Sequence, residues 1–184
     1  NYRMESAKTY VGGIIGYSNV QNVTISHCLN TGALTYTGTG NSYFGGIVGS
    51  SCSTSATADF TTSLLKITDC LNVGTISGTS AQTFMGGVIG NAGGLDGDGN
   101  ATVVIENSYS SINLDESNNV VGVNSPVGNN YGDDFASCES VAYENLLGEL
   151  AYSSTQLDFV TESDTTGYWK ARENDTPILK DFFQ

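Results

Sequence analysis

Tyr43-Phe44-Gly45-Gly46-Ile47-Val48-Gly49 is one of three copies of a glycine-centred motif in this chain. The first copy begins at Tyr10 and the third at Phe84, so the paired glycines stand at 12/13, 45/46 and 86/87. The copies are therefore 33 and then 41 residues apart. A fixed motif with spacers of variable length is typical of a stacked array, in which the strands keep their register while the loops differ.

A companion block follows each glycine motif. It reads Cys28-Leu29-Asn30-Thr31-Gly32 in the first repeat and Cys70-Leu71-Asn72-Val73-Gly74 in the second, and a weaker version at 105–114 has Ser108 in place of the cysteine. Apolar and polar side chains alternate through the block as they do in a strand, but neither face is wholly apolar. We therefore expect a bend near 72–74, because Asn and Gly tolerate the left-handed backbone of a corner.

The repeats predict an all-β fold, a right-handed parallel β-solenoid (β-helix) with a C-terminal cap. Its three repeats span about 10–42, 43–83 and 84–125 within a solenoid region of 1–125. A repeat of this length exceeds one ordinary solenoid coil, so we expect two coils per repeat, one for each motif. Parallel crossovers are overwhelmingly right-handed, which gives the expected hand. An antiparallel β-sandwich is the alternative, because it also has regularly spaced strands and turns.

Residues 126–184 differ in composition, with more Glu, Asp, Tyr and Leu and fewer glycines. We interpret them as a degraded repeat followed by the cap. A solenoid must cover its last open strand edge, since an uncovered edge pairs with other chains. Trp169, Ile178 and Leu179 are expected to pack on the final coil. The chain starts at Asn1, and we expect it to be part of a larger chain.

The charge balance excludes some classes of partner. Nineteen acidic residues against six basic ones give a formal net charge of −13. Binding of nucleic acid needs a basic face, so nucleic acid is not an expected partner. No stretch approaches the roughly 20 apolar residues of a membrane-spanning helix, so no membrane insertion of this segment is expected. A strongly acidic surface suits an extracellular protein and permits binding of cations.

The repeated motifs resemble the GLUG-motif repeats of bacterial surface and secreted proteins. The matching cores are Gly13-Ile14-Ile15-Gly16, Gly46-Ile47-Val48-Gly49 and Gly87-Val88-Ile89-Gly90. The Cys-x-Asn-x-Gly blocks also resemble sequences found in these proteins. So does the end of the chain, where Trp169 is followed by Pro177-Ile178-Leu179. The resemblance implies a location outside the cell or on its surface and an adhesin-like role. Such repeats also occur beside the catalytic region of IgA-specific metallopeptidases, and the family assigns them no catalytic residues.

We therefore expect a non-catalytic repeat module for adhesion or ligand display, which binds a glycan or a protein through loops 50–63 and 91–102. Recognition is usually placed on loops that a rigid scaffold carries. A carbohydrate-active enzyme on a β-helix is one alternative, with Asp133 and Asp134 as its carboxylate pair. A purely structural spacer is the other.

Three sets of residues are singled out: possible calcium ligands, aromatic rings expected to stack within the repeat, and surface tyrosines that could bind a ligand. Asp96, Asp98 and Asn100 place oxygen ligands at alternate positions, as at the start of a calcium loop, so calcium is the one cofactor considered. Tyr10, Tyr43 and Phe84 are equivalent in the repeat and are expected to stack on one another. The candidates for ligand binding through surface aromatic rings are Tyr17, Tyr36, Tyr109 and Tyr131.

The four cysteines and the single histidine lack the spacing of a zinc site. Cys28 and Cys70 hold equivalent positions, and two coils per repeat would separate their sulfur atoms by about 10 Å, too far for a disulfide. They are expected to be buried thiols in an internal ladder. A disulfide between Cys52 and Cys138 stays open. His27 is expected to lie on the surface, on the opposite face of the strand from Cys28.

Overall fold

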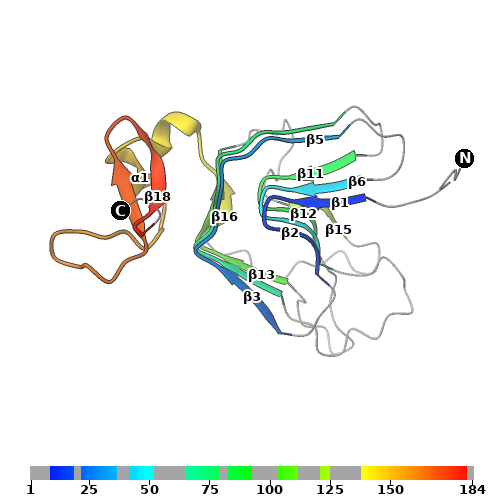
Figure 1. Ribbon diagram of the computed structural model, residues 1–184, viewed down its shortest axis with the longest axis horizontal. Coiled ribbons are helices and arrows are strands. Elements are labelled where there is room, and N and C mark those ends of the chain that lie inside the picture. Colours follow the sequence, from blue (N-terminus) through cyan, green and yellow to red (C-terminus); the bar gives the residue numbers. More distant parts are fainter. Residues whose placement is uncertain are drawn as a thin grey trace, which may run out of the picture.

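A computed structural model describes residues 9–18, 22–36, 42–51, 65–78, 83–92, 103–111, 121–124 and 138–181 of the chain. These residues form short strands that are grouped into small sheets, and helix is confined to the C-terminal region (Figure 1). None of the helices in these ranges is long and apolar enough to cross a membrane.

Each repeat contributes one strand to each of several sheets. The first coil contains β1 (Thr9–Gly12), β2 (Ile15–Tyr17), β3 (Val23–Ser26), β4 (Leu29–Asn30) and β5 (Leu34–Tyr36). The second contains β6 (Ser42–Gly45), β7 (Val48–Ser50), β8 (Leu65–Thr68), β9 (Leu71–Asn72) and β10 (Ile76–Gly78). The third contains β11 (Thr83–Gly86), β12 (Ile89–Ala92), β13 (Val103–Glu106) and β14 (Ser108–Ser110). A fourth begins with β15 (Val121–Asn124) and β16 (Cys138–Ser140).

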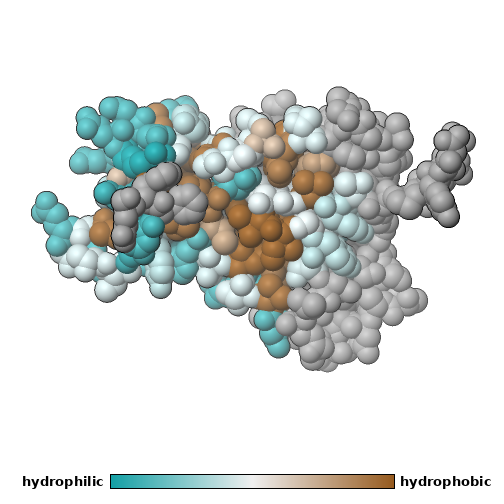
Figure 2. Space-filling model, viewed as in Figure 1, coloured by the Kyte–Doolittle hydropathy of each residue, from teal (hydrophilic) through white to brown (hydrophobic). Residues whose placement is uncertain are grey.

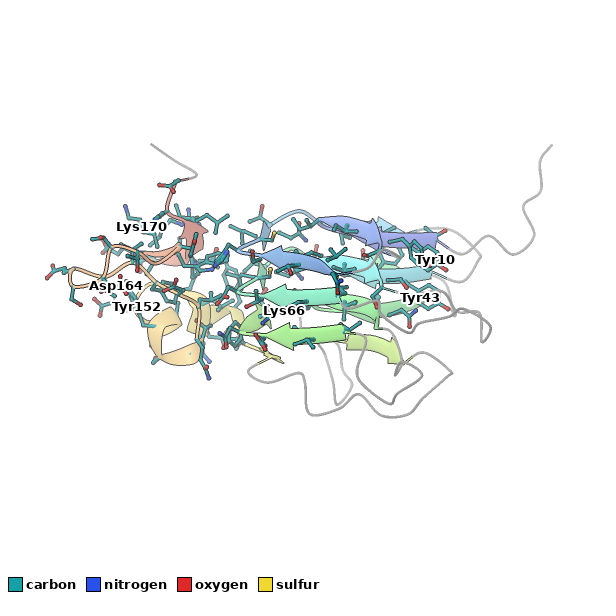
Figure 3. All side chains as sticks on the ribbon, turned by 90° about the horizontal axis from the view of Figure 1, so that it is seen from below. Tyr10, Tyr43, Lys66, Tyr152, Asp164 and Lys170 are labelled. Carbon is teal, nitrogen blue, oxygen red and sulfur yellow. The ribbon has the colours of Figure 1, made fainter. Side chains whose placement is uncertain are left out.

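Equivalent strands of successive coils pair in parallel. The sheets run β1-β6-β11, β15-β12-β7-β2, β13-β8-β3, β16-β14-β9-β4 and β10-β5. Figure 1 looks along the stack, so strands of one sheet overlap, and Figure 3 shows them from the side as separate parallel arrows. The predicted parallel solenoid is confirmed, and the antiparallel sandwich is wrong. The coil strands continue to Ser140, within the segment that we interpret as a degraded repeat and cap.

The expectation of two coils per repeat is wrong, because each repeat forms one coil. Gly12 pairs with Gly45 in one sheet, and Leu29 pairs with Leu71 in another. The glycine motif and the companion block therefore lie on different walls of the same coil. One coil contains many residues because each wall has its own strand and spacers connect the walls.

The two motifs occur together because they pack against each other inside the coil. A Cβ atom added to Gly46 would overlap the side-chain amide of Asn72 and the carbonyl oxygen of Gly87 in the next coil. Gly13 stands in the same relation to Asn30. The second glycine of each pair is thus required for close approach between walls. This contact leaves room for a stack of asparagines and not for an extra methyl group.

The asparagines form a hydrogen-bonded ladder through the coils. The Asn30 Nδ2 atom donates to Asn72 Oδ1 over 2.8 Å, and the Asn72 Nδ2 atom donates to Ser110 Oγ over 3.3 Å. Each asparagine also accepts from a glycine amide two residues later, Gly32 for the first and Gly74 for the second. Asn72 and Ser110 have no exposed surface, so the ladder satisfies polar groups that water does not reach.

Each companion block begins at a left-handed corner that the sequence did not predict. The corner residues are His27, Asp69 and Asn107, with φ values of 52°, 52° and 44°. They lie between β3 and β4, between β8 and β9, and between β13 and β14, respectively. The bend expected near 72–74 is also present, at Gly74, where the chain passes from β9 in one sheet to β10 in another, but no residue of this bend has a left-handed backbone. Asn, Asp and His adopt the left-handed conformation more readily than other non-glycine residues, which fits all three corners.

The described residues form two apolar cores. The first fills the coils and contains ladders such as Ile25, Ile67 and Ile105. The second lies outside the sheet β16-β14-β9-β4, where Leu71 and Tyr109 meet the C-terminal unit. Figure 2 shows apolar residues gathered on the end face formed by the first coil, where Ile14 is 44% exposed.

The C-terminal unit, residues 141–181, lies beside the coils (Figure 1). It contains the 3-10 helix η1 (Tyr143–Leu146), helix α1 (Leu150–Ser154) and a hairpin of β17 (Trp169–Arg172) and β18 (Asp175–Leu179). The prediction that Trp169 packs on the final coil is wrong, because its indole contacts Asp69 in the second coil. The unit covers a wall of the solenoid and spans several coils.

Candidate functional site

The C-terminal unit is held on the row of left-handed corners. The Trp169 Nε1 atom donates to the carbonyl oxygen of Asp69 over 3.2 Å, and Trp169 has no exposed surface. One coil earlier, the His27 ring stacks on Tyr168 with centroids 3.7 Å apart. His27 is therefore half-buried in a contact, where a surface residue was expected. The corner that bends each strand also provides the docking points for the unit.

Tyr109 was predicted as a surface residue for ligand binding, and this prediction is wrong. Its side chain is 1% exposed and belongs to the core between the coils and the C-terminal unit. The backbone N–H of Gln156 donates to the Tyr109 hydroxyl oxygen over 2.8 Å. Tyr109 therefore ties the third coil to the segment that follows α1.

Exposed apolar and aromatic side chains gather on the C-terminal unit. Its exposed members are Tyr143, Leu150, Tyr152 and Tyr168, which are between 42% and 54% exposed. Figure 3 shows Tyr152 on this unit, at the opposite end of the molecule from Tyr10 and Tyr43. Amphipathic aromatic rings that remain in contact with water are common in recognition surfaces. We therefore take the unit, and not the coils, as the candidate site.

A groove of about 730 Å³ crosses the unit between its helices and its hairpin. Its lining residues are Glu144, Leu147, Gly148, Glu149, Leu150, Tyr152, Ala171, Arg172, Glu173 and Asn174. A second groove of about 490 Å³ shares Tyr152 and Ala171 with the first and is lined by Lys170 and Lys180. Tyr152 thus stands on the ridge between the two grooves. Both volumes fall in the range of small-molecule sites.

The larger groove is acidic. It is lined by the carboxylates of Glu144, Glu149 and Glu173, and its one cation, Arg172, forms an ion pair with Asp175 at 2.8 Å. The Arg172 Nε atom also donates to the carbonyl oxygen of Thr176 over 2.8 Å, which holds the guanidinium along the hairpin. The groove therefore presents hydrogen-bond acceptors beside an aromatic ring, and it disfavours anionic ligands.

The smaller groove owes its shape to the loop that leads into the hairpin. Lys180 donates to the carbonyl oxygens of Thr165 and Thr166, and its Nζ atom lies 5.5 Å from the Tyr168 ring centroid. The hydroxyl and the amide of Thr166 both donate to Asp164, which lowers the pKa of that exposed carboxyl group. These contacts define the loop conformation.

Among the other predicted ligand-binding tyrosines, Tyr17 is the one whose side chain the structure describes. Tyr17 is 39% exposed, and its ring lies 4.8 Å from that of Tyr10. Tyr36 ends β5, but its side chain lies outside the described residues, as does the whole of Tyr131. Tyr10 and Tyr43 stack as predicted, with centroids 5.5 Å apart. The Phe84 side chain is also outside the described part.

The predicted calcium ligands Asp96, Asp98 and Asn100 lie outside the described residues, as do Asp133 and Asp134. Within the ranges that the structure describes, no three His, Cys, Asp or Glu side chains are grouped closely enough to hold a metal ion. The carboxylates of the acidic groove therefore do not form such a group. Calcium binding by Asp96, Asp98 and Asn100 stays a prediction from the sequence.

Cys28 and Cys70 are neighbours, so the predicted separation of about 10 Å between their sulfurs is wrong. One coil per repeat places the two residues in adjacent coils, and both thiols are free. A hydrogen bond from the Cys70 side chain lowers the pKa of the Cys28 thiol to about 7, against the opposing effect of burial. The same contact, together with burial, raises the pKa of the Cys70 thiol.

Cys138 also belongs to this column, because it pairs with Ser108 in the sheet register. The sequence indicated equivalent positions for Cys28 and Cys70 and missed this third cysteine. Cys52 lies outside the described residues, so its pairing with Cys138 stays untested.

Comparison with models of protein families, with curated proteins and with solved structures finds no match to this chain. The resemblance to GLUG-motif repeats stays a prediction.

Sequence reasoning missed the groove for an identifiable reason. Its residues come from η1, the Gly148 turn, α1 and the tip of the hairpin, and residues 155–168 separate α1 from the hairpin. The signal available in the sequence was the shift to Glu, Asp, Tyr and Leu in residues 126–184. That signal marks a different unit without showing which of its side chains share a surface.

Proposed function

We propose that this chain is a non-catalytic module of an extracellular bacterial protein, in which a rigid solenoid carries a lateral unit that binds a glycan. The supporting observation is the groove in which Tyr152 lies beside three glutamates. A tyrosine ring offers a stacking surface for a sugar, and carboxylates accept hydrogen bonds from its hydroxyl groups. The extracellular and bacterial setting is what the resemblance to GLUG-motif repeats implies.

Two further features support a binding role for this unit. The described coil interior is filled by ladders of apolar, thiol and amide side chains, so the coils offer a rigid support. The unit is joined to that support through Trp169 and Tyr109, both of which are almost fully buried. A site on a rigid support loses less conformational entropy on binding than a site on a mobile segment. The acidic lining favours neutral or cationic glycans over sulfated or sialylated ones.

A glycan array followed by titration calorimetry tests this function. We expect binding to at least one neutral or amino-sugar glycan, with Tyr152→Ala weakening the affinity by about tenfold or more, since loss of a stacked ring costs on the order of 1.5 kcal/mol. Tyr143→Ala is the matched control, because Tyr143 is similarly exposed on the same unit but does not line the groove. Equal loss in both variants, or no loss in either, contradicts the assignment of the groove.

The same samples separate the alternatives. A structural spacer predicts no bound glycan on the array and no heat on titration. A carbohydrate-active enzyme predicts reducing ends released from a bound polysaccharide over hours, and loss of that release on replacing Asp133 and Asp134 with asparagine. Binding without turnover supports the proposed role.

A further inference from the structure

Cys28 and Cys70 occupy one column of the solenoid, one coil apart. The next residues along, Leu29 and Leu71, pair directly, and the Leu71 N–H donates to the Cys28 carbonyl oxygen over 2.8 Å. Neighbouring strands lie about 4.8 Å apart. This spacing falls within the Cα separations of roughly 4.4–6.8 Å that disulfides span. The backbone therefore holds these cysteines at a distance that a disulfide can bridge.

The two side chains point into the same space. Cys70 belongs to the interior core of the coils and Cys28 packs against it, and each thiol shifts the pKa of the other. Each thiol also donates to the carbonyl oxygen two residues earlier, Cys28 to Ser26 over 3.3 Å and Cys70 to Thr68 over 3.2 Å. These matching contacts give the two side chains the same orientation in successive coils.

The thiols differ in exposure because the first coil ends the described stack. Cys70 is covered by coils on both sides and has no exposed surface. Cys28 has only one neighbouring coil and is half-buried. A reagent from solution therefore reaches Cys28 first, and Cys70 is within reach of whatever forms on Cys28.

We propose that Cys28 and Cys70 form a site of covalent cross-linking, in which a small disulfide such as oxidised glutathione converts the two thiols into a disulfide between the first and second coils. In the first step, the Cys28 thiolate attacks the reagent, so an S–S bond forms to Cys28 and one glutathione thiolate leaves. In the second, the Cys70 sulfur attacks the Cys28 sulfur and expels the second glutathione, which takes the Cys70 proton. Two protein thiols are oxidised to one disulfide while one reagent disulfide is reduced to two thiols.

The column itself makes this pair specific. Ser108 follows Cys70 in the third coil, and its hydroxyl accepts from the Cys70 N–H over 3.2 Å. Cys138 is next, in register with Ser108, so two strand spacings of about 9.6 Å in total separate it from Cys70. That distance exceeds the reach of a disulfide. The inference does not depend on the proposed function, because it concerns the coils alone.

The test uses the full chain with Cys52→Ser and Cys138→Ser, which leaves only the two thiols in question. Serine is suited to this column because Ser108 already occupies it. The folded, reduced protein is incubated with oxidised glutathione, alkylated and digested with trypsin. Cleavage after Lys66 places Cys28 in the peptide 9–66 and Cys70 in the peptide 67–170. We expect the two peptides to be joined, and to separate on reduction.

The control adds Cys70→Ser, which should retain a glutathione adduct on Cys28 and give no joined peptides. The unaltered chain digested with chymotrypsin provides a second measurement, because cleavage at Tyr36 and Tyr43 separates Cys28 from Cys52. A stable glutathione adduct on Cys28 without joined peptides, in protein whose circular dichroism is unchanged, would overturn the proposal. So would joining of Cys28 to any other cysteine in the unaltered chain.

Discussion

Replacement of Asn72 by alanine tests the asparagine ladder, which the structure places at the centre of the coil stack. Asn72 has no exposed surface and lies between Asn30 of the first coil and Ser110 of the third. The substitution removes the amide and leaves the rest of the coil unchanged. It also leaves a polar cavity beside Gly46, where the amide group packs.

The expected cost follows from three hydrogen bonds. Asn72 accepts from Asn30 over 2.8 Å and from the Gly74 amide over 3.2 Å, and it donates to Ser110 over 3.3 Å. Each is worth about 1 kcal/mol net. Two of the groups left behind have a second partner, since Gly74 also donates to the Asn30 carbonyl oxygen and the Asn30 amide reaches the Gly32 carbonyl oxygen. We therefore expect a loss of about 3 kcal/mol in the free energy of unfolding.

Urea unfolding followed by circular dichroism measures this loss. For a slope of about 2 kcal/mol per M, the midpoint should fall by about 1.5 M. Asn30→Ala is the graded control and should cost less, because it ends the ladder and is 7% exposed. Thr75→Ala, at an exposed position of the same coil, should change stability by less than about 0.5 kcal/mol. If Asn72→Ala costs no more than Thr75→Ala, the ladder does not stabilise the stack and the reasoning fails.

Three further predictions concern the glycine row, the docked unit and the thiol pair. Gly46→Ala should destabilise the coils by about 3 kcal/mol or more, because its Cβ overlaps backbone atoms of the next coil, and thermal unfolding measures this. Trp169→Phe should cost about 2 kcal/mol by leaving the Asp69 carbonyl without its donor, and limited proteolysis should then cleave the C-terminal unit while the coils persist. In the two-cysteine variant (Cys52→Ser with Cys138→Ser), the rate of Cys28 alkylation should rise with pH, with a midpoint near pH 7. Adding Cys70→Ala should move that midpoint toward pH 9.0. An unchanged midpoint would show that Cys70 does not lower the pKa of Cys28.

The sign of the thiol effect on stability follows from the same values. The pKa of Cys28 is lower in the folded chain, about 7, than its ordinary 9.0. The folded state therefore favours the thiolate, so this interaction stabilises the protein fully above pH 9 and is lost as the pH falls through 7. The two-cysteine variant should become more stable relative to its Cys70→Ala derivative between pH 7 and pH 9. Urea midpoints measured at both pH values check the direction.

The sequence by itself determined the stacking of coils. A glycine motif and a Cys-x-Asn-x-Gly block that recur with elastic spacers require equivalent positions to have equivalent surroundings, and parallel in-register strands satisfy that requirement. The stack of Tyr10 on Tyr43 follows from the same logic. The shift in composition near the end of the chain likewise indicated a unit of another kind.

Only the tertiary structure decided how much chain makes one coil, and with it which residues touch. A repeat length does not say whether its motifs lie on successive coils or on two walls of one coil, so the neighbouring thiols of Cys28 and Cys70 were missed. Burial of Tyr109 was missed because an outward-facing aromatic side chain has the same sequence pattern whether water or another unit covers it. The groove beside Tyr152 depends on the packing of η1 and the Gly148 turn against the hairpin, and periodicity carries no information about such a contact.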